Sequence, residues 1–510
     1  MNAVALPFRG DHLAIAKRLC APLALIALWA VVYLPNLRTS PKWYGDEFVT
    51  LIAGDAILRG HFHNRALTYS FFSTFTNYQP PGLTLYGLSA AMTGGDVVGG
   101  RLLSTALCAV LAVVCYLSLS PDLGRLTAFI ASATLLLAPQ HTIHFRWIYP
   151  HYLCTVAVIG IAILLRRPAS PKRDWLIGSC CAVAAAGHLL VVYVVAGALL
   201  ARITRPSAWP RILVPPGLVV LASLALGYLI SGPQLLLDLR ELAGGYADDS
   251  QRSTYTDKVI NVFRFFSFDW YHVLLFSSFF ALAALRRWPE LALVSVISFA
   301  IIQNRPELPV FYYQSMVFVP LLGLYAIETL RHFTELGFQS TFGDSKLIRP
   351  ASQLVILGIP LAFAPDALTH SLQGTHAPRN NHWVAPSIED LEESANWINS
   401  QTESDELVVA FWDAGWMLKG RWTDLMQCAI WEYGQFPYFY NRKRGHEEFV
   451  FPADLTKARY LLVGPLDVRW LWGQGNIPKL LEEHAVLQWP IVHQNASTVV
   501  LKNPRFQLLR

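Results

Sequence analysis

Two adjacent carboxylates, Asp46 and Glu47, are the side chains of this sequence best suited to acid–base chemistry. They follow the first long apolar run of a charge-poor chain, and charges at a membrane edge are costly unless they serve a function. A carboxylate within hydrogen-bond reach of a hydroxyl group can take its proton as a general base. The alternative is structural, because the apolar spacing up to Arg59 predicts an amphipathic surface helix whose N-terminus the carboxylates would cap. For the pair the sequence favours chemistry; for Glu47 alone both roles stay open.

A second polar group lies in the turn 141–152, which combines histidine, arginine and aromatic side chains. His144, Arg146 and His151 are its candidates for contacts with a phosphate and a sugar ring. The alternative is an interfacial aromatic belt in which Arg146 reaches toward the lipid headgroups. Both interpretations are kept.

Two further candidates lie on the same expected side of the chain. Arg305 could contact a phosphate, or it could belong to an ion-paired loop with Glu307. His188 could line the site, although a lone histidine near a helix end is more often a hydrogen-bonded interfacial residue.

The elements that must position these residues are membrane helices. Of 510 residues, 54% are hydrophobic and 15% are charged, whereas soluble proteins have about 25% charged residues. We therefore expect a polytopic α-helical membrane protein with about eleven spans. The apolar runs of spanning length lie near residues 20–37, 101–120, 125–140, 151–166, 211–232, 269–285, 289–303, 309–330 and 351–366, and the longer run 175–203 holds two more spans.

The placement of Lys and Arg sets the expected orientation, since these residues concentrate in cytoplasmic loops. The N-terminus is then cytoplasmic and the C-terminus is outside. The basic loops expected inside are 166–173, 202–211, 286–287 and 331–349. This arrangement requires segment 80–95 to lie along the membrane surface, and it divides the run 175–203 into two short helices that turn near His188.

The chain divides into a transmembrane domain, residues 1–366, and a small extracytoplasmic α/β domain, residues 367–510. Ser387 begins a capping-box pattern before a helix that ends near residue 400. The expected strands are 406–411, 458–463 and 497–502.

The seven cysteines fall mostly in or beside the expected spans, so they are interpreted as apolar core residues and not as a disulfide or metal framework. The net charge of +5 comes mainly from the basic loops. No nucleic-acid partner is indicated.

The order of the polar motifs resembles the N-terminal signature of the GT-C integral-membrane glycosyltransferases. After Asp46-Glu47 and the amphipathic stretch come Tyr78-Gln79-Pro80-Pro81-Gly82 and then Gly95-Asp96, followed by Arg101-Leu102-Leu103-Ser104. Protein O-mannosyltransferases and lipid A aminoarabinose transferases look most similar. The resemblance covers roughly residues 20–232, with the C-terminal domain as a looser parallel.

The resemblance implies a sugar donor on a polyprenyl phosphate, with Asp46 as the catalytic base and Glu47 as its neighbour. It adds Tyr78 and Gln79 to the expected donor-binding residues. Arg146 matches an arginine often seen at this turn in relatives, but the acidic residue that some relatives carry shortly after it is absent here.

Metal binding is the second point of difference. Aminoarabinose-transferase-like enzymes hold a metal partly through an acid just before the Pro-Pro element, where this chain has Tyr78-Gln79. We therefore expect no metal at that position, while a divalent cation between Asp46 or Glu47 and the donor phosphate stays open.

The expected function is inverting transfer of a sugar from a polyprenyl-phosphate donor to an envelope lipid, glycan or protein. The reaction would take place on the outer face of the cytoplasmic membrane, where the chain would be embedded among membrane lipids. The alternatives are a lipid or polysaccharide transporter or flippase, and a non-catalytic envelope assembly protein. Transporters usually show repeated halves with ionisable residues near mid-membrane, which this sequence lacks.

Overall fold

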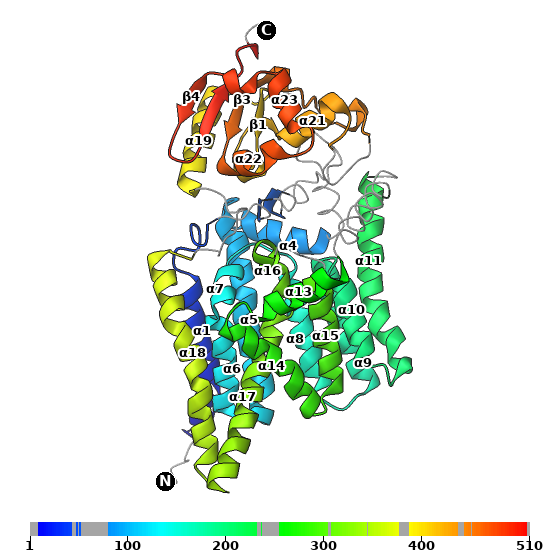
Figure 1. Cartoon of the computed structure of the whole chain (residues 1–510), viewed down its shortest axis with the longest axis vertical. Coiled ribbons are helices and arrows are strands. Elements are labelled where there is room, and N and C mark those ends of the chain that lie inside the picture. Colours follow the sequence, from blue (N-terminus) through cyan, green and yellow to red (C-terminus); the bar gives the residue numbers. More distant parts are fainter. Residues whose placement is uncertain are drawn as a thin grey trace, which may run out of the picture.

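A bundle of helices carries a smaller α/β domain at one end (Figure 1). This computed structural model describes residues 9–42, 47–48, 50–52, 80–231, 236, 254–303, 308–343, 345–376, 387–436, 443–449 and 451–506.

The bundle is built from helices of very different length. They are α1 (Arg9–Tyr33), α4 (Pro80–Ala91), α5 (Val97–Leu123), α6 (Arg125–Leu137), α7 (Pro139–His144), α8 (Tyr152–Leu165), α9 (Pro171–Gly187), α10 (Val191–Leu200), α11 (Trp209–Ser231), α13 (Tyr255–Phe266), α14 (Trp270–Ala284), α15 (Trp288–Gln303), α16 (Leu308–Ser315), α17 (Val319–Phe342) and α18 (Ile348–Gln373).

Within the described ranges, three segments are long and apolar enough to cross a membrane: Val97–Leu123, Pro206–Leu229 and Ile348–Gln373. The pair α13 and α14 passes the same test together, although it is bent by 111°. Shorter apolar helices such as α6, α8 and α15 fill the rest of the bundle. The fold is therefore that of a helical membrane protein, while the figure of about eleven spans stays a prediction.

Several local expectations can be compared with these helices. The run 175–203 is broken between α9 and α10 at His188, as predicted. Helix α4 lies across the ends of the upright helices (Figure 1), which agrees with a surface position for segment 80–95. The expected span 309–330 is two helices instead of one, since α16 ends at Ser315 and α17 begins at Val319.

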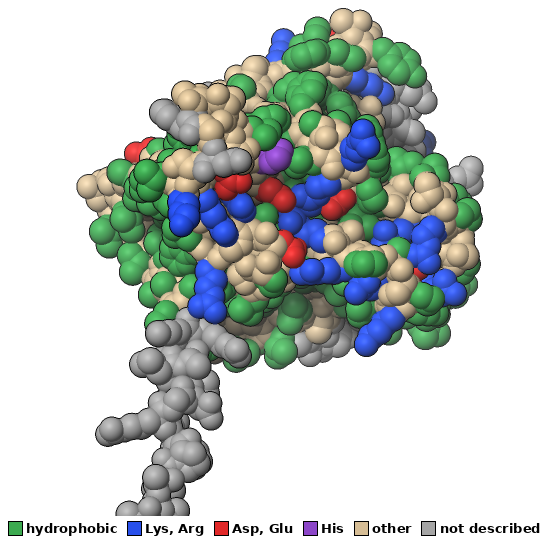
Figure 2. Space-filling model, turned by 90° about the horizontal axis from the view of Figure 1, so that it is seen from below, with side chains coloured by type: hydrophobic (Ala, Val, Ile, Leu, Met, Phe, Trp, Pro, Cys, Tyr) green, Lys and Arg blue, Asp and Glu red, His purple; other side chains and the backbone are tan. Residues whose placement is uncertain are grey.

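The basic loops meet at the end of the bundle farthest from the α/β domain, where Lys and Arg side chains gather (Figure 2). Arg166 and Arg287 both pair with Glu328 of α17, at 2.5 and 2.7 Å. Arg331 donates a hydrogen bond of 2.8 Å to the backbone oxygen of Leu123. These contacts place the ends of α5, α8 and α14 beside the middle of α17 on one side of the bundle, and the cytoplasmic assignment of that side remains a prediction.

The C-terminal domain contains a five-stranded sheet among its described residues, in the order β2-β1-β3-β5-β4. The strands are β1 (Leu407–Ala410), β2 (Arg421–Thr423), β3 (Ala458–Val463), β4 (Ile491–Gln494) and β5 (Val499–Lys502). Its helices are α19 (Ile388–Gln401), α20 (Trp412–Gly415), α21 (Leu425–Tyr433), α22 (Pro465–Arg469) and α23 (Ile477–Glu483).

Strands β2, β1 and β3 run parallel, and β5 and β4 complete the sheet in antiparallel pairs. The predicted helix and three predicted strands correspond to α19, β1, β3 and β5. Ser387 caps α19 by accepting a hydrogen bond from the Asp390 backbone N–H at 3.3 Å. The expected domain boundary at 366 falls inside α18, which continues to Gln373.

Candidate active site

Glu47 lies in a buried ion pair with Arg101 at the end of the bundle that faces the α/β domain. Both side chains are fully inaccessible to solvent. The Arg101 guanidinium donates to both carboxylate oxygens, at 2.9 and 2.8 Å, and the backbone N–H of Ile148 donates to Oε1 at 3.0 Å. Charge-assisted two-point contacts of this kind fix both the charge and the orientation of a carboxylate. Glu47 is therefore held firmly in place.

Local sequence explains how Arg101 reaches this place. Asp96 caps α5 by accepting from the Val98 N–H at 3.2 Å. The next turn carries two glycines that lie against other segments of the same chain. A Cβ on Gly99 would lie 2.1 Å from a backbone oxygen of α4, and a Cβ on Gly100 would lie 2.6 Å from the Ile148 side chain. Small residues are needed here because α4 and the turn after α7 approach α5 so closely.

Arg101 and Arg146 together hold the loop that follows α1. Arg101 donates to the backbone oxygens of Leu37 and Pro41, at 2.9 and 3.0 Å. Arg146 is fully buried and donates to the backbone oxygens of Ser40 and Pro35, at 2.6 and 2.8 Å. In this structure Arg146 therefore supports the loop after α1. Its expected contact with a donor phosphate or with lipid headgroups stays a prediction.

The histidines of the turn lie in an aromatic cluster with α16. His144 stacks on Tyr312, with ring centroids 5.0 Å apart, and His151 lies 5.1 Å from Tyr313. His188, from the break between α9 and α10, lies 5.3 Å from His151. The structure thus brings His151 and His188 together and places His144 on the neighbouring tyrosine.

The Pro-Pro-Gly element joins this cluster. A Cβ on Gly82 would lie 2.6 Å from the backbone oxygen of Ala186, and one on Gly187 would lie 2.6 Å from that of Pro150. The start of α4 therefore packs directly over the turn and the break. Three of the motifs noted in the sequence converge in one region.

A hydrogen-bonded chain leads from Tyr312 to the surface, and sequence reasoning missed it. The Tyr312 hydroxyl lies 2.7 Å from His272 Nε2, and His272 Nδ1 lies 2.8 Å from an oxygen of Asp269, which also caps α14. The role of Arg101 as the buried partner of Glu47 was missed as well. An arginine in an apolar helix is itself a signal of a buried partner.

Other expected site residues cannot be placed. Asp46, Tyr78, Gln79 and Arg305 lie outside the described residues. Among the residues that are described, no group of three His, Cys, Asp or Glu side chains is arranged to hold a metal ion.

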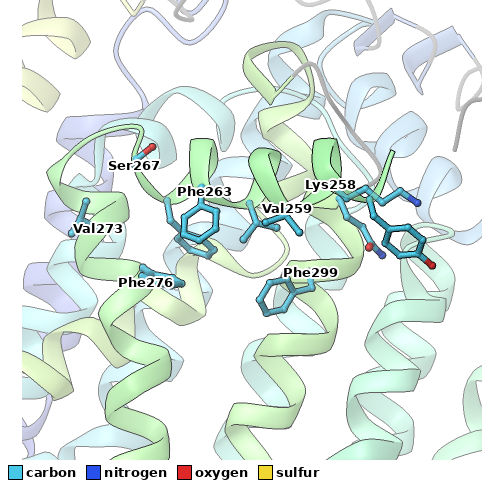
Figure 3. Close-up of a pocket in the computed structure, with 11 residues that line it drawn as sticks. Lys258, Val259, Phe263, Ser267, Val273, Phe276 and Phe299 are labelled. Atoms are coloured by element: carbon cyan, nitrogen blue, oxygen red, sulfur yellow. The ribbon is translucent and has the colours of Figure 1, made fainter. Parts of the chain in front are cut away.

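An apolar groove of about 450 Å³ lies between α13, α14 and α15 (Figure 3). Its walls include Val259, Phe263, Phe276 and Phe299, and Lys258 lies at one end. Phe263 is 66% exposed and Phe299 is 45% exposed, so the groove opens to the surroundings of the bundle.

Helix α13 separates this groove from the aromatic cluster. A capping box of Thr254 and Asp257 starts the helix, and its apolar and polar residues alternate with helical spacing. Phe265 points inward and stacks on Tyr312 at 5.8 Å, whereas Phe263 lines the groove. The groove and the cluster are thus adjacent, one on each face of α13.

The chain is similar in structure to solved membrane proteins. ArnT from Cupriavidus metallidurans, bound to undecaprenyl phosphate, matches with a TM-score of 0.57 at 13% identity, over 97% of this chain and 98% of ArnT. The apo state of the same protein matches with a TM-score of 0.55 at 12% identity, over 97% and 99%.

An oligosaccharyltransferase from Archaeoglobus fulgidus, in complex with Zn and sulfate, matches with a TM-score of 0.52 at 11% identity. That match covers 91% of this chain and 71% of the archaeal protein. No protein-family model and no curated protein sequence matches the chain. The structures share one fold along nearly the whole chain.

Proposed function

We propose that this chain, which has the fold of the GT-C glycosyltransferases, transfers a sugar from a polyprenyl-phosphate donor to an envelope lipid, glycan or protein. The observation that carries the proposal is the set of contacts that Arg101 and the Ile148 N–H make with Glu47. They hold this acidic residue at the end of the bundle where the groove and the aromatic cluster also lie. The reaction is assigned to the outer face of the cytoplasmic membrane, and it inverts the anomeric centre.

Within this proposal, Asp46 is the general base and Glu47 is a positioning residue. Transfer to a hydroxyl group requires a carboxylate that can accept a proton. Glu47 suits that role poorly, because Arg101 neutralises its charge at 2.8 Å. The same contact argues against a divalent cation on Glu47, since the cation would lie beside a guanidinium. Asp46 is the adjacent carboxylate.

The groove is assigned to the isoprenoid tail of the donor. Its apolar walls and its opening toward the membrane suit a long hydrocarbon chain, and Lys258 at one end suits an anionic phosphate. The aromatic cluster on the other face of α13 is buried among the described residues. His144, His151 and His188 stay proposed contacts of the sugar. Tyr78, Gln79 and Arg305 stay proposed donor contacts on the basis of the sequence alone.

The test is turnover by purified protein in lipid nanodiscs, with polyprenyl-phosphate-linked sugars as donors and envelope lipid extract as acceptor. Asp46→Asn keeps the size of the side chain but cannot take the proton, so transfer should fall about 10²- to 10⁴-fold. Protein yield and thermal unfolding should match the wild type.

Two results would contradict the proposal. Near-normal transfer by Asp46→Asn would remove the base from the mechanism. Movement of a labelled lipid-linked sugar across vesicles, with no new glycosidic bond in any acceptor, would favour the transporter alternative.

A further inference from the structure

The segment that carries Glu47 also contacts the C-terminal domain. Phe48 directly follows Glu47, is fully buried, and stacks on Trp416 with ring centroids 6.1 Å apart and ring planes 18° apart. Leu51 and Ile52 belong to the same apolar cluster as the core of the α/β domain. This short helical segment therefore shares one continuous apolar core with a domain more than 300 residues away in sequence.

Trp416 is fixed by its own domain. It follows α20 at the carboxyl end of β1, and its indole N–H donates to the backbone oxygen of Asp413 at 3.0 Å. The turn packs tightly, because a Cβ on Gly415 would lie 2.3 Å from the Trp422 ring. The indole is thus a rigid surface for Phe48.

A second contact joins the domain to the loop in front of the acidic segment. Arg38 lies in the loop that Arg101 and Arg146 hold. Its guanidinium pairs with Asp96, the cap of α5, at 2.9 Å, and it also pairs with Glu392 of α19. The domain therefore contacts the chain both before and after the acidic pair.

From these contacts we propose that the C-terminal domain is a positioning element of the active site, and that Trp416 is its main positioning residue. The proposal rests on the proposed glycosyl transfer. Arg101 and the Ile148 N–H hold Glu47 from the bundle, and Trp416 contacts Phe48 from the C-terminal domain. Loss of this second support lets the carboxylates shift, and a misplacement of about 1 Å costs on the order of 10²-fold in rate.

The signature of positioning is a split between turnover and donor binding. Trp416→Ala should lower kcat roughly 10- to 100-fold, while the affinity for undecaprenyl phosphate stays within about twofold of the wild type. Trp416→Phe keeps an aromatic face for Phe48 and should recover most of the turnover. A residue needed only for folding would lower the yield of folded protein but leave kcat per folded molecule unchanged, so kcat is normalised to the folded fraction.

Trp489→Ala is the matched control. Trp489 is a buried tryptophan of the same domain, and its indole N–H also donates to a backbone oxygen, that of His484, at 3.2 Å. It should destabilise the domain about as much as Trp416→Ala without lowering kcat of the folded fraction.

A double-mutant cycle completes the test. If the stack transmits the effect, Phe48→Ala and Trp416→Ala should each lower kcat, and the double variant should be little worse than either single one. Wild-type kcat in Trp416→Ala, or additive losses in the double variant, would overturn the positioning role while leaving glycosyl transfer intact. Absence of transfer by the wild-type protein with every donor tried would overturn both proposals.

Discussion

At the scale of single residues, the ion pair of Glu47 and Arg101 gives the two neighbouring carboxylates different expected behaviour. Removing one partner of a buried pair leaves the other charge uncompensated, which costs about 3–5 kcal/mol. Glu47→Gln should therefore lower the thermal unfolding temperature of the detergent-purified protein, whereas Asp46→Asn should not. Differential scanning fluorimetry of both variants checks this. A stable but inactive Glu47→Gln protein would instead assign the proton transfer to Glu47.

The C-terminal domain contains a second pair of acids, at the carboxyl ends of β1 and β3. Asp413 and Asp467 are both buried, and a Cβ on Gly464 would lie 3.8 Å and 3.6 Å from an oxygen of each. Burial raises the pKa of Asp413 to about 7. Burial, reinforced by the charge of Asp413, raises the pKa of Asp467 well above its usual range.

These raised pKa values predict the sign of a pH effect on stability. The folded state binds protons that the unfolded chain releases near pH 4, so the free energy of unfolding should fall as the pH rises from about 4 to about 7. The loss should be on the order of a few kcal/mol. Asp413→Asn should flatten the profile and stabilise the protein at pH 7.5. Thermal unfolding at pH 4.5, 5.5, 6.5 and 7.5 measures the pH dependence of stability. An unchanged slope in Asp413→Asn would show that Asp413 does not cause it.

At the scale of elements, α13 defines the groove that we assign to the donor. Lys258→Gln should weaken binding of undecaprenyl phosphate roughly 10-fold or more, because a charge-assisted contact to an anion contributes about 1.5–3 kcal/mol. Native mass spectrometry or a thermal-shift titration measures the affinity. Lys172→Gln, at the opposite end of the bundle, is the control with the same change of charge. Equal affinity in the two variants would remove Lys258 from the phosphate site.

The elements also show how far sequence reasoning reached. Long periodic stretches gave α5, α8 and α15 close to their bounds, and the capping pattern at Ser387 gave α19. Strands β2 and β4 were missed, because β2 has only three residues and β4 exposes most of its side chains. Helix α13 lies between the expected spans 211–232 and 269–285 and was missed, since its single apolar face makes it amphipathic instead of span-like. The break between α16 and α17 was missed although Pro320, in the first turn of α17, is typical of a helix start.

Contacts between residues distant in sequence could not be predicted for a different reason. The acidic pair could be found because both residues are adjacent, but the pairing of Glu47 with Arg101 and of Phe48 with Trp416 depends on tertiary packing. Tertiary packing also gives Arg146 its backbone acceptors, and its contact with a donor phosphate stays a prediction. The GT-C fold expected from the order of motifs is confirmed by the structural matches.

At the scale of the whole molecule, the clustering of basic loops at one end leads to a topology test. In a background without the native cysteines, Lys172→Cys and Lys346→Cys should react with a membrane-impermeant maleimide only after the cells are opened. Lys419→Cys and Lys502→Cys in the α/β domain should react in intact spheroplasts. Labelling of Lys172→Cys in intact spheroplasts would reverse the assigned orientation.

The opening of the groove to the surroundings of the bundle has a consequence for the turnover of the lipid carrier. A donor that enters from the bilayer searches in two dimensions and never crosses water with its tail. Under the proposed function, the spent carrier keeps the same tail after the sugar has left, so it should occupy the same groove. Product inhibition should then be competitive with the donor, and sustained turnover in cells should depend on how fast other enzymes withdraw the discharged carrier from the outer leaflet.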